Sequence, residues 1–168
     1  MSTLSRGYGE FSDEQELLER LRQGSPRTLI IDIEPLVAYW DGSQDALDRG
    51  IVRVLDAVAA VPSVTVVCFA TNSARRPSAQ PRSPGIRVVY LASARKPAQI
   101  KPYRSFPRPG IVIGDQLLTD GLLAKRLGYA FLHYRPRLTG APIGSQVLHG
   151  LGRLARRAVF GSNHRPEP

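Results

Sequence analysis

The chain has 168 residues, with 23 Lys and Arg against 14 Asp and Glu, which gives a formal net charge of +9. This length suits one domain with its own core, and a hydrophobic content of 42% excludes a wholly disordered chain. A single cysteine excludes an internal disulfide framework and a cysteine-based zinc cluster. The longest apolar runs are far shorter than the ~20 residues of a membrane span, and no apolar signal segment is evident, so we expect a cytoplasmic protein.

The first predicted element is a helix near the N-terminus. Residues 1–11 show no regular pattern and are expected to be loose. Ser12 then has capping-box spacing to Gln15, and acidic residues fill the first turn, where the helix dipole favours them. This predicted helix ends at Gly24.

Further along the chain, short apolar β-branched runs alternate with helical patterns or Pro-rich loops. Strands of this kind, buried on both faces, predict an α/β fold with a parallel sheet. The stretches 73–85 and 96–109 are rich in proline and are expected to be loops with at most a short helical turn. The strands are predicted at 28–33, 64–70, 86–91, 110–114 and 129–134, and the helices at 43–60, 119–127 and 145–160.

The pattern suggests three parts: an N-terminal segment with one helix (1–27), a core (28–140), and a basic amphipathic helix with a tail (141–168). The last helix could lie on an anionic membrane surface, or could dock on the sheet with its arginines in water.

Charge divides unevenly between the two halves of the chain. Residues 1–74 hold 6 basic and 11 acidic side chains, whereas residues 75–168 hold 17 basic and 3 acidic ones. This asymmetry favours an anionic partner, which could be nucleic acid, a lipid headgroup surface or a phosphorylated substrate.

Candidate functional residues follow the predicted strands, because ligands of parallel α/β sheets bind beyond the carboxyl ends of the strands. Converging carboxylates favour a divalent cation, and all-oxygen ligands suit Mg²⁺. A carboxylate beside such an ion can attack phosphorus, while a lysine and a hydroxyl neutralise and orient the phosphoryl oxygens. The candidates in chain order are Asp32, Glu34, Thr71, Asn72, Lys96, Asp115 and Asp120.

The order Asp-x-acid, hydrophobic-Thr-Asn, Lys-Pro and Gly-Asp-x4-Asp resembles the haloacid dehalogenase (HAD) superfamily of phosphatases. The stretches 94–97 and 112–120 are similar to its IIIA-type, YqeG-like branch, which includes phosphatidylglycerophosphate phosphatases. The resemblance implies a Rossmann-like three-layer parallel sheet of about five strands, without a cap domain. It also implies that the strands at 28–33 and 110–114 are neighbours, which would bring Asp32 and Asp115 together.

The resemblance further implies a role for each candidate. Asp32 would be the nucleophile and Glu34 the acid/base, assisted by Lys96. The phosphoryl group would be bound by Thr71, Asn72 and Lys96. Mg²⁺ would be held by Asp32, the backbone carbonyl of Glu34, Asp115 and Asp120.

The first motif departs from the family pattern Asp-x-Asp-Asn-Thr-Leu, because Glu34, Pro35 and Leu36 replace its last Asp and the next two residues. Three hypotheses therefore stand. The first is a Mg²⁺-dependent phosphomonoester hydrolase that forms an aspartyl-phosphate, with an anionic phospholipid such as phosphatidylglycerophosphate as a candidate substrate. The second is a catalytically degenerate relative that binds a phosphorylated ligand, an anionic membrane or a protein. The third is a nucleic-acid-binding protein.

Overall fold

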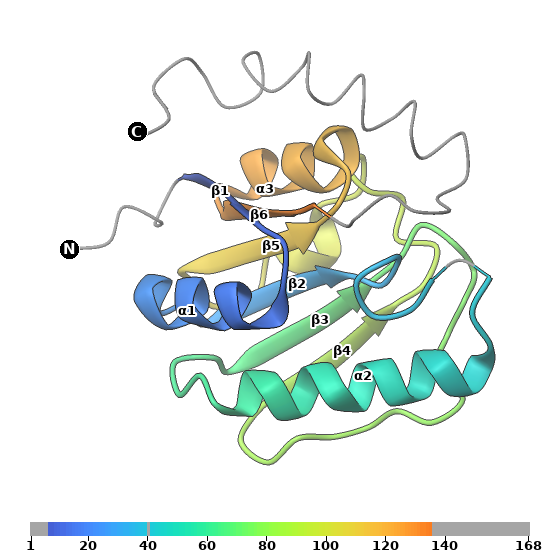
Figure 1. Cartoon of the computed structure of the whole chain (residues 1–168). Coiled ribbons are helices and arrows are strands. Elements are labelled where there is room, and N and C mark those ends of the chain that lie inside the picture. Colours follow the sequence, from blue (N-terminus) through green and yellow to red (C-terminus); the bar gives the residue numbers. More distant parts are fainter. Residues whose placement is uncertain (1–6, 40, 136–168) are drawn as a thin grey trace.

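The computed structural model describes residues 7–39 and 41–135 and contains a six-stranded parallel sheet (Figure 1). Its strand order is β1-β6-β5-β2-β3-β4. The predicted pairing of the strand that ends at Asp32 with the strand that ends at Gly114 is confirmed, since β2 lies between β3 and β5. The strands are β1 (Tyr8–Phe11), β2 (Thr28–Asp32), β3 (Val66–Ala70), β4 (Arg87–Leu91), β5 (Gly110–Gly114) and β6 (Ala130–Tyr134).

Helices cover both faces of this sheet (Figure 1), so the prediction of a three-layer α/β fold with a parallel sheet is confirmed. Helices α1 (Glu14–Gly24) and α2 (Gln44–Ala59) bury one set of apolar side chains against one face. Helix α3 (Leu122–Leu127) and a short 3-10 turn at Lys101–Tyr103 bury a second set against the other face. The three central strands β2, β3 and β5 are buried along their whole length, as their unbroken apolar runs predicted.

The expectation of a loose segment over residues 1–11 is wrong for Tyr8–Phe11. These residues form β1, an edge strand that pairs in parallel with β6. Tyr8 and Phe11 are buried, but the strand has only four residues, and Gly9 and Glu10 between them have low β propensity. The sequence pattern of a strand is therefore weak here. The strand is stabilised by its pairing with β6, which lies 119 or more residues away in sequence. A local sequence pattern cannot indicate such a distant partner.

The start of α1 also differs from the prediction. Asp13 is the N-cap, and its carboxylate accepts a hydrogen bond of 2.9 Å from the Glu16 amide. Glu16 in turn accepts a bond of 3.0 Å from the amide of Ser12, the residue before the N-cap. The expected Ser12–Gln15 box is therefore wrong, and the cap lies one residue later, at Asp13.

The remaining connections match their Pro-rich sequences. The segments 71–86 and 92–100 contain neither helix nor strand, apart from an isolated bridge between Ser83 and Ile86. The segment between β2 and β3 holds α2 and its connecting loops. The predicted helix at 145–160, its proposed membrane contact and the 141–168 tail lie outside the described residues. Within the described part of the chain, no helix is both long and apolar enough to cross a bilayer.

Candidate metal and phosphoryl site

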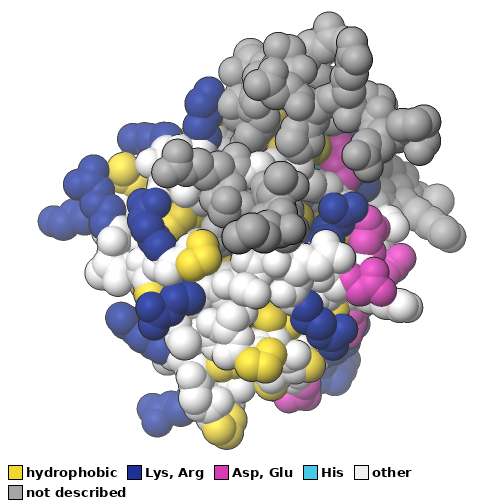
Figure 2. All heavy atoms as spheres, turned by 90° about the vertical axis from the view of Figure 1, so that its left-hand side faces the viewer, with side chains coloured by type: hydrophobic (Ala, Val, Ile, Leu, Met, Phe, Trp, Pro, Cys, Tyr) yellow, Lys and Arg dark blue, Asp and Glu magenta, His cyan; other side chains and the backbone are white. Residues whose placement is uncertain are grey.

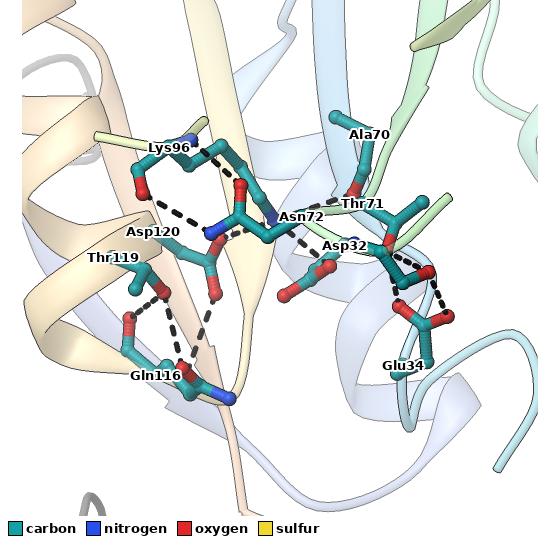
Figure 3. Close-up of polar contacts among 10 residues, drawn as sticks. Asp32, Glu34, Ala70, Thr71, Asn72, Lys96, Gln116, Thr119 and Asp120 are labelled. Carbon is teal, nitrogen blue, oxygen red and sulfur yellow. Dashed lines mark hydrogen bonds and ion pairs between the residues drawn. The ribbon is translucent and has the colours of Figure 1, made fainter. Parts of the chain in front are cut away.

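The candidate residues meet at one edge of the sheet because all the strands run in the same direction. Asp32 is the last residue of β2, Thr71 directly follows β3, and Asp115 directly follows β5. Since β2 is hydrogen-bonded to both β3 and β5, these three positions are neighbours at the carboxyl edge. Figure 3 shows Asp32 and Thr71 close together there. Lys96 enters the same place from the loop after β4.

Three aspartates form the acidic centre of this site. Ligand oxygens of Asp32, Asp115 and Asp120 all lie within 4.8 Å of one another. The three residues are 8%, 1% and 0% exposed, respectively, so water screens their mutual repulsion poorly. This cluster could hold a metal ion, because a cation would compensate buried carboxylates that have too few positive partners.

Lys96 supplies part of that compensation. Its buried ammonium lies 2.8 Å from an oxygen of Asp32 and 2.8 Å from an oxygen of Asp120. It also donates a hydrogen bond of 3.2 Å to the backbone carbonyl of Ala70. All three ammonium protons thus have acceptors within the protein.

The electrostatics of the site are unusual in two ways. Burial and the neighbouring Asp120 raise the pKa of Asp32 well above its ordinary value, against the opposing effect of Lys96. Burial lowers the pKa of Lys96, but Asp120 and Asp32 outweigh that effect and raise it. A divalent cation would lower the pKa of Asp32 and so favour its ionised form.

Asp120 reaches the site through an irregular turn. Residues Leu117–Gly121 form a π-helical turn before α3, a distortion often found at functional sites. The Asp120 carboxylate packs against Gly114, where an added Cβ would lie 2.3 Å from an Asp120 oxygen. The same oxygen accepts a hydrogen bond of 3.4 Å from the amide of Gln116, and the other oxygen binds Lys96. Asp120 therefore binds Lys96 together with Asp32 and is also a candidate metal ligand.

Asn72 lies beside Lys96 but uses its side chain on the backbone. Its carbonyl oxygen accepts a hydrogen bond of 2.7 Å from the Lys96 amide, and its NH₂ group donates one of 3.1 Å to the Lys96 carbonyl. This pair of bonds fixes where the lysine enters the site. A role in binding phosphate remains a prediction for Asn72, whereas positioning of Lys96 follows from its contacts.

Glu34 turns toward the loop after β3. Its carboxylate accepts a hydrogen bond of 2.7 Å from the Thr71 hydroxyl and one of 3.3 Å from the Ser73 hydroxyl (Figure 3). Glu34 and Thr71 are 7% and 1% exposed. The acid and the hydroxyl that the sequence assigned to separate roles are therefore bonded directly to each other.

Sequence reasoning missed three contributors to the site, and it included Gly114 only as part of the Gly-Asp-x4-Asp motif. The Ala70 carbonyl, Ser73 and Gly114 act through contacts that depend on the folded backbone. His133, which was assigned only to a strand, does lie in β6, and its ring also lies 3.0 Å from the backbone carbonyl of Asp115. The Thr-Asn-Ser order and the glycine before Asp115 were the only local signals available for Ser73 and Gly114.

The described residues that follow β3 carry a strong excess of positive charge. Between residues 75 and 135 the only acidic side chains are Asp115 and Asp120, and both are buried. In Figure 2, which views the molecule from the side where the strands begin, Lys and Arg lie mainly on the left, whereas Asp and Glu gather on the right. Exposed basic residues in this part of the chain include Arg82, Arg87, Arg95, Lys101, Arg104, Arg108, Lys125 and Arg126.

Comparisons with protein-family models, with curated proteins and with solved structures give no match to this chain.

Proposed function

We propose that this protein is a Mg²⁺-dependent phosphomonoester hydrolase that forms a covalent phosphate ester of Asp32. The observation that carries the proposal is the buried cluster of Asp32, Asp115 and Asp120 with Lys96 bridging two of its members. The all-oxygen donor set suits Mg²⁺, which typically combines one or two protein carboxylates with substrate phosphate oxygens. The order of motifs shared with HAD phosphatases supports the same assignment.

In the first step, a carboxylate oxygen of Asp32 attacks the phosphorus and the bond to the alcohol oxygen breaks. The attacking oxygen is assigned to the one that does not bind Lys96. For this step Glu34 must carry a proton taken up from solvent, which it donates to the departing alcohol, as a carboxylic acid two residues from the nucleophile can. The positive charge of Lys96 and the Thr71 hydroxyl stabilise the phosphoryl oxygens.

In the second step, water attacks the same phosphorus, the bond to Asp32 breaks, and Glu34 accepts the proton of the water. The products are inorganic phosphate and the regenerated carboxylate. Mg²⁺, held by Asp32, Asp115, the Glu34 carbonyl and Asp120, would supply positive charge to the phosphoryl oxygens and keep Asp32 ionised. The net positive charge of the chain would favour the approach of a phosphorylated substrate.

One observation favours a second candidate function, in which the site binds a phosphoryl group but turns it over slowly. The Thr71 hydroxyl is bonded to Glu34, so the group assigned to the substrate already has a partner. Glu34 is also one methylene longer than the aspartate of the family motif, and a displacement of ~1 Å can cost on the order of 10²-fold in rate.

Hydrolysis of p-nitrophenyl phosphate by the purified protein, with Mg²⁺ or with EDTA, tests the proposal. We expect activity that requires Mg²⁺ and that falls by at least about 10³-fold in Asp32→Asn, because a covalent step is lost. Asp41→Asn is the matched control, since Asp41 is exposed in the loop after β2. The same variants can then be assayed on phosphatidylglycerophosphate in mixed micelles.

Three outcomes separate the candidates. Metal-dependent activity that Asp32→Asn abolishes supports the hydrolase. Mg²⁺-dependent binding of phosphate without turnover favours the binding protein. Activity that is unaffected by EDTA and by Asp32→Asn would mean that the assignment is wrong.

A further inference from the structure

The contacts of Glu34 bear on how the proposed site opens to its substrate. The Thr71 hydroxyl has a single proton, and the 2.7 Å contact with Glu34 uses it. The oxygen of the same hydroxyl accepts a bond of 3.0 Å from the Ser73 amide. Thr71 can therefore donate to a phosphoryl oxygen only after its bond to Glu34 breaks.

Ser73 binds the other side of the same carboxylate. Its hydroxyl lies 3.3 Å from Glu34 and 3.0 Å from the Thr71 hydroxyl, and it accepts a bond of 3.2 Å from the amide of Arg75. Ser73 is exposed, whereas Glu34 and Thr71 are buried, so Ser73 lies at the solvent side of this three-residue group. A Glu34 carboxylate that leaves Thr71 still has a hydroxyl partner in Ser73.

The loop that carries Ser73 is held in place by several bonds. The Arg75 guanidinium donates hydrogen bonds to the backbone carbonyls of Tyr39, Gly42 and Ser43, which lie between β2 and α2. The Ser73 carbonyl accepts a bond of 2.7 Å from the Ser93 amide. The hydroxyl pair that faces Glu34 is thus part of a fixed wall of the site.

From these contacts we infer that the Glu34 carboxylate occupies the phosphoryl position on Thr71 in the free protein, and that substrate must displace it toward Ser73. The inference rests on the proposed function and adds to it an internal competitor. A carboxylate and a phosphoryl group are both anions that need the same donor, so they bind to Thr71 in competition. Because the reach of Glu34 to both hydroxyls depends on its second methylene, an aspartate at this position would compete less.

Binding of inorganic phosphate in the presence of Mg²⁺, measured by calorimetry, tests the inference without any need for turnover. Glu34→Asp is expected to bind phosphate about tenfold more tightly than the wild type, the scale of one hydrogen bond to a charged group. Thr71→Val is expected to change the wild-type affinity by less than about threefold but to remove the gain in the Glu34→Asp background. This non-additive cycle is the signature of competition for one hydroxyl.

Ser73→Ala provides a second variant, with Ser78→Ala as its control on the same loop, because Ser78 bonds to Asp48 instead. Because Ser73 is the hydroxyl that receives the displaced Glu34 carboxylate, its loss is expected to weaken phosphate binding by about two- to threefold, and Ser78→Ala should leave phosphate binding unchanged. Tighter binding in Ser73→Ala, or equal binding by Glu34→Asp and wild type, would overturn the inference alone. Absence of phosphate binding in every variant would overturn the proposed function as well.

Discussion

Lys96 should be the most costly residue of the site to remove, and the structure allows the cost to be worked out. Its ammonium lies 2.8 Å from Asp32 and 2.8 Å from Asp120, with a side-chain exposure of 2%. Lys96→Met keeps the length of the aliphatic chain but leaves two buried carboxylates without their cation. Breaking a buried ion pair in this way costs about 3–5 kcal/mol.

Urea unfolding in EDTA measures this cost as a change in the free energy of unfolding. For a chain of this size, the same loss lowers the melting temperature by roughly 6–20 °C, at 2–4 °C per kcal/mol. Lys101→Met is the matched control, because Lys101 is exposed, and it should change stability by less than about 0.5 kcal/mol.

Adding Asp32→Asn to Lys96→Met removes one of the two stranded carboxylates and should recover about 1–3 kcal/mol, since neighbouring charges couple. Added Mg²⁺ should stabilise Lys96→Met more than the wild type, because the ion replaces the missing positive charge. If Lys96→Met were as stable as Lys101→Met, or if Asp32→Asn gave no recovery, the electrostatic account of the site would be refuted.

Two further predictions follow from the same cluster. Burial and Asp120 raise the pKa of Asp32 in the folded protein. The contribution of Asp32 to stability is therefore full below the pKa of about 3.9 that an aspartate has in the unfolded chain, and it is lost as the pH rises through the pKa of the folded state. In EDTA, the wild type should therefore lose stability relative to Asp32→Asn as the pH is raised, and Mg²⁺ should reduce the difference; parallel pH profiles would contradict this. Gly114→Ala places a Cβ 2.3 Å from an Asp120 oxygen and should cost about 1–3 kcal/mol of stability together with most of the proposed phosphatase activity. Wild-type stability and rate in Gly114→Ala would show that Asp120 does not depend on this close approach.

The sequence predicted the sheet and the acidic cluster because both rest on local patterns. Unbroken apolar runs marked the strands β2, β3 and β5, and parallel strands bring the residues that follow them to one edge. The neighbouring positions of Asp32 and Asp115 then followed from the order of strands in the family that the motifs resemble. The edge strand β1 was missed because its pairing with β6 depends on residues distant in sequence.

The partners of the polar side chains were less accessible to sequence reasoning. Asn72 and Thr71 were both assigned to phosphate, but an amide or hydroxyl chooses its partner from whichever backbone and side-chain atoms the fold brings within about 3 Å. The fold brings the Lys96 backbone to Asn72 and the Glu34 carboxylate to Thr71. The sequence motifs therefore indicated which residues lie together in the site, whereas the hydrogen bonds among these residues could be identified only from the structure.

Counting charges in the site links the metal, the lysine and the displacement of Glu34. With its three aspartates ionised, the cluster holds three negative charges against the single positive charge of Lys96, and a divalent cation makes it neutral. A phosphomonoester then brings up to two negative charges, and Glu34 in its ionised form adds another a few ångströms from the same hydroxyl. At low effective dielectric this repulsion is largest when Glu34 stays on Thr71, so arrival of the substrate itself favours movement of the carboxylate toward the exposed Ser73. The longer acid would then be away from Thr71 when the phosphoryl group is bound and still close enough, through Ser73, to exchange a proton.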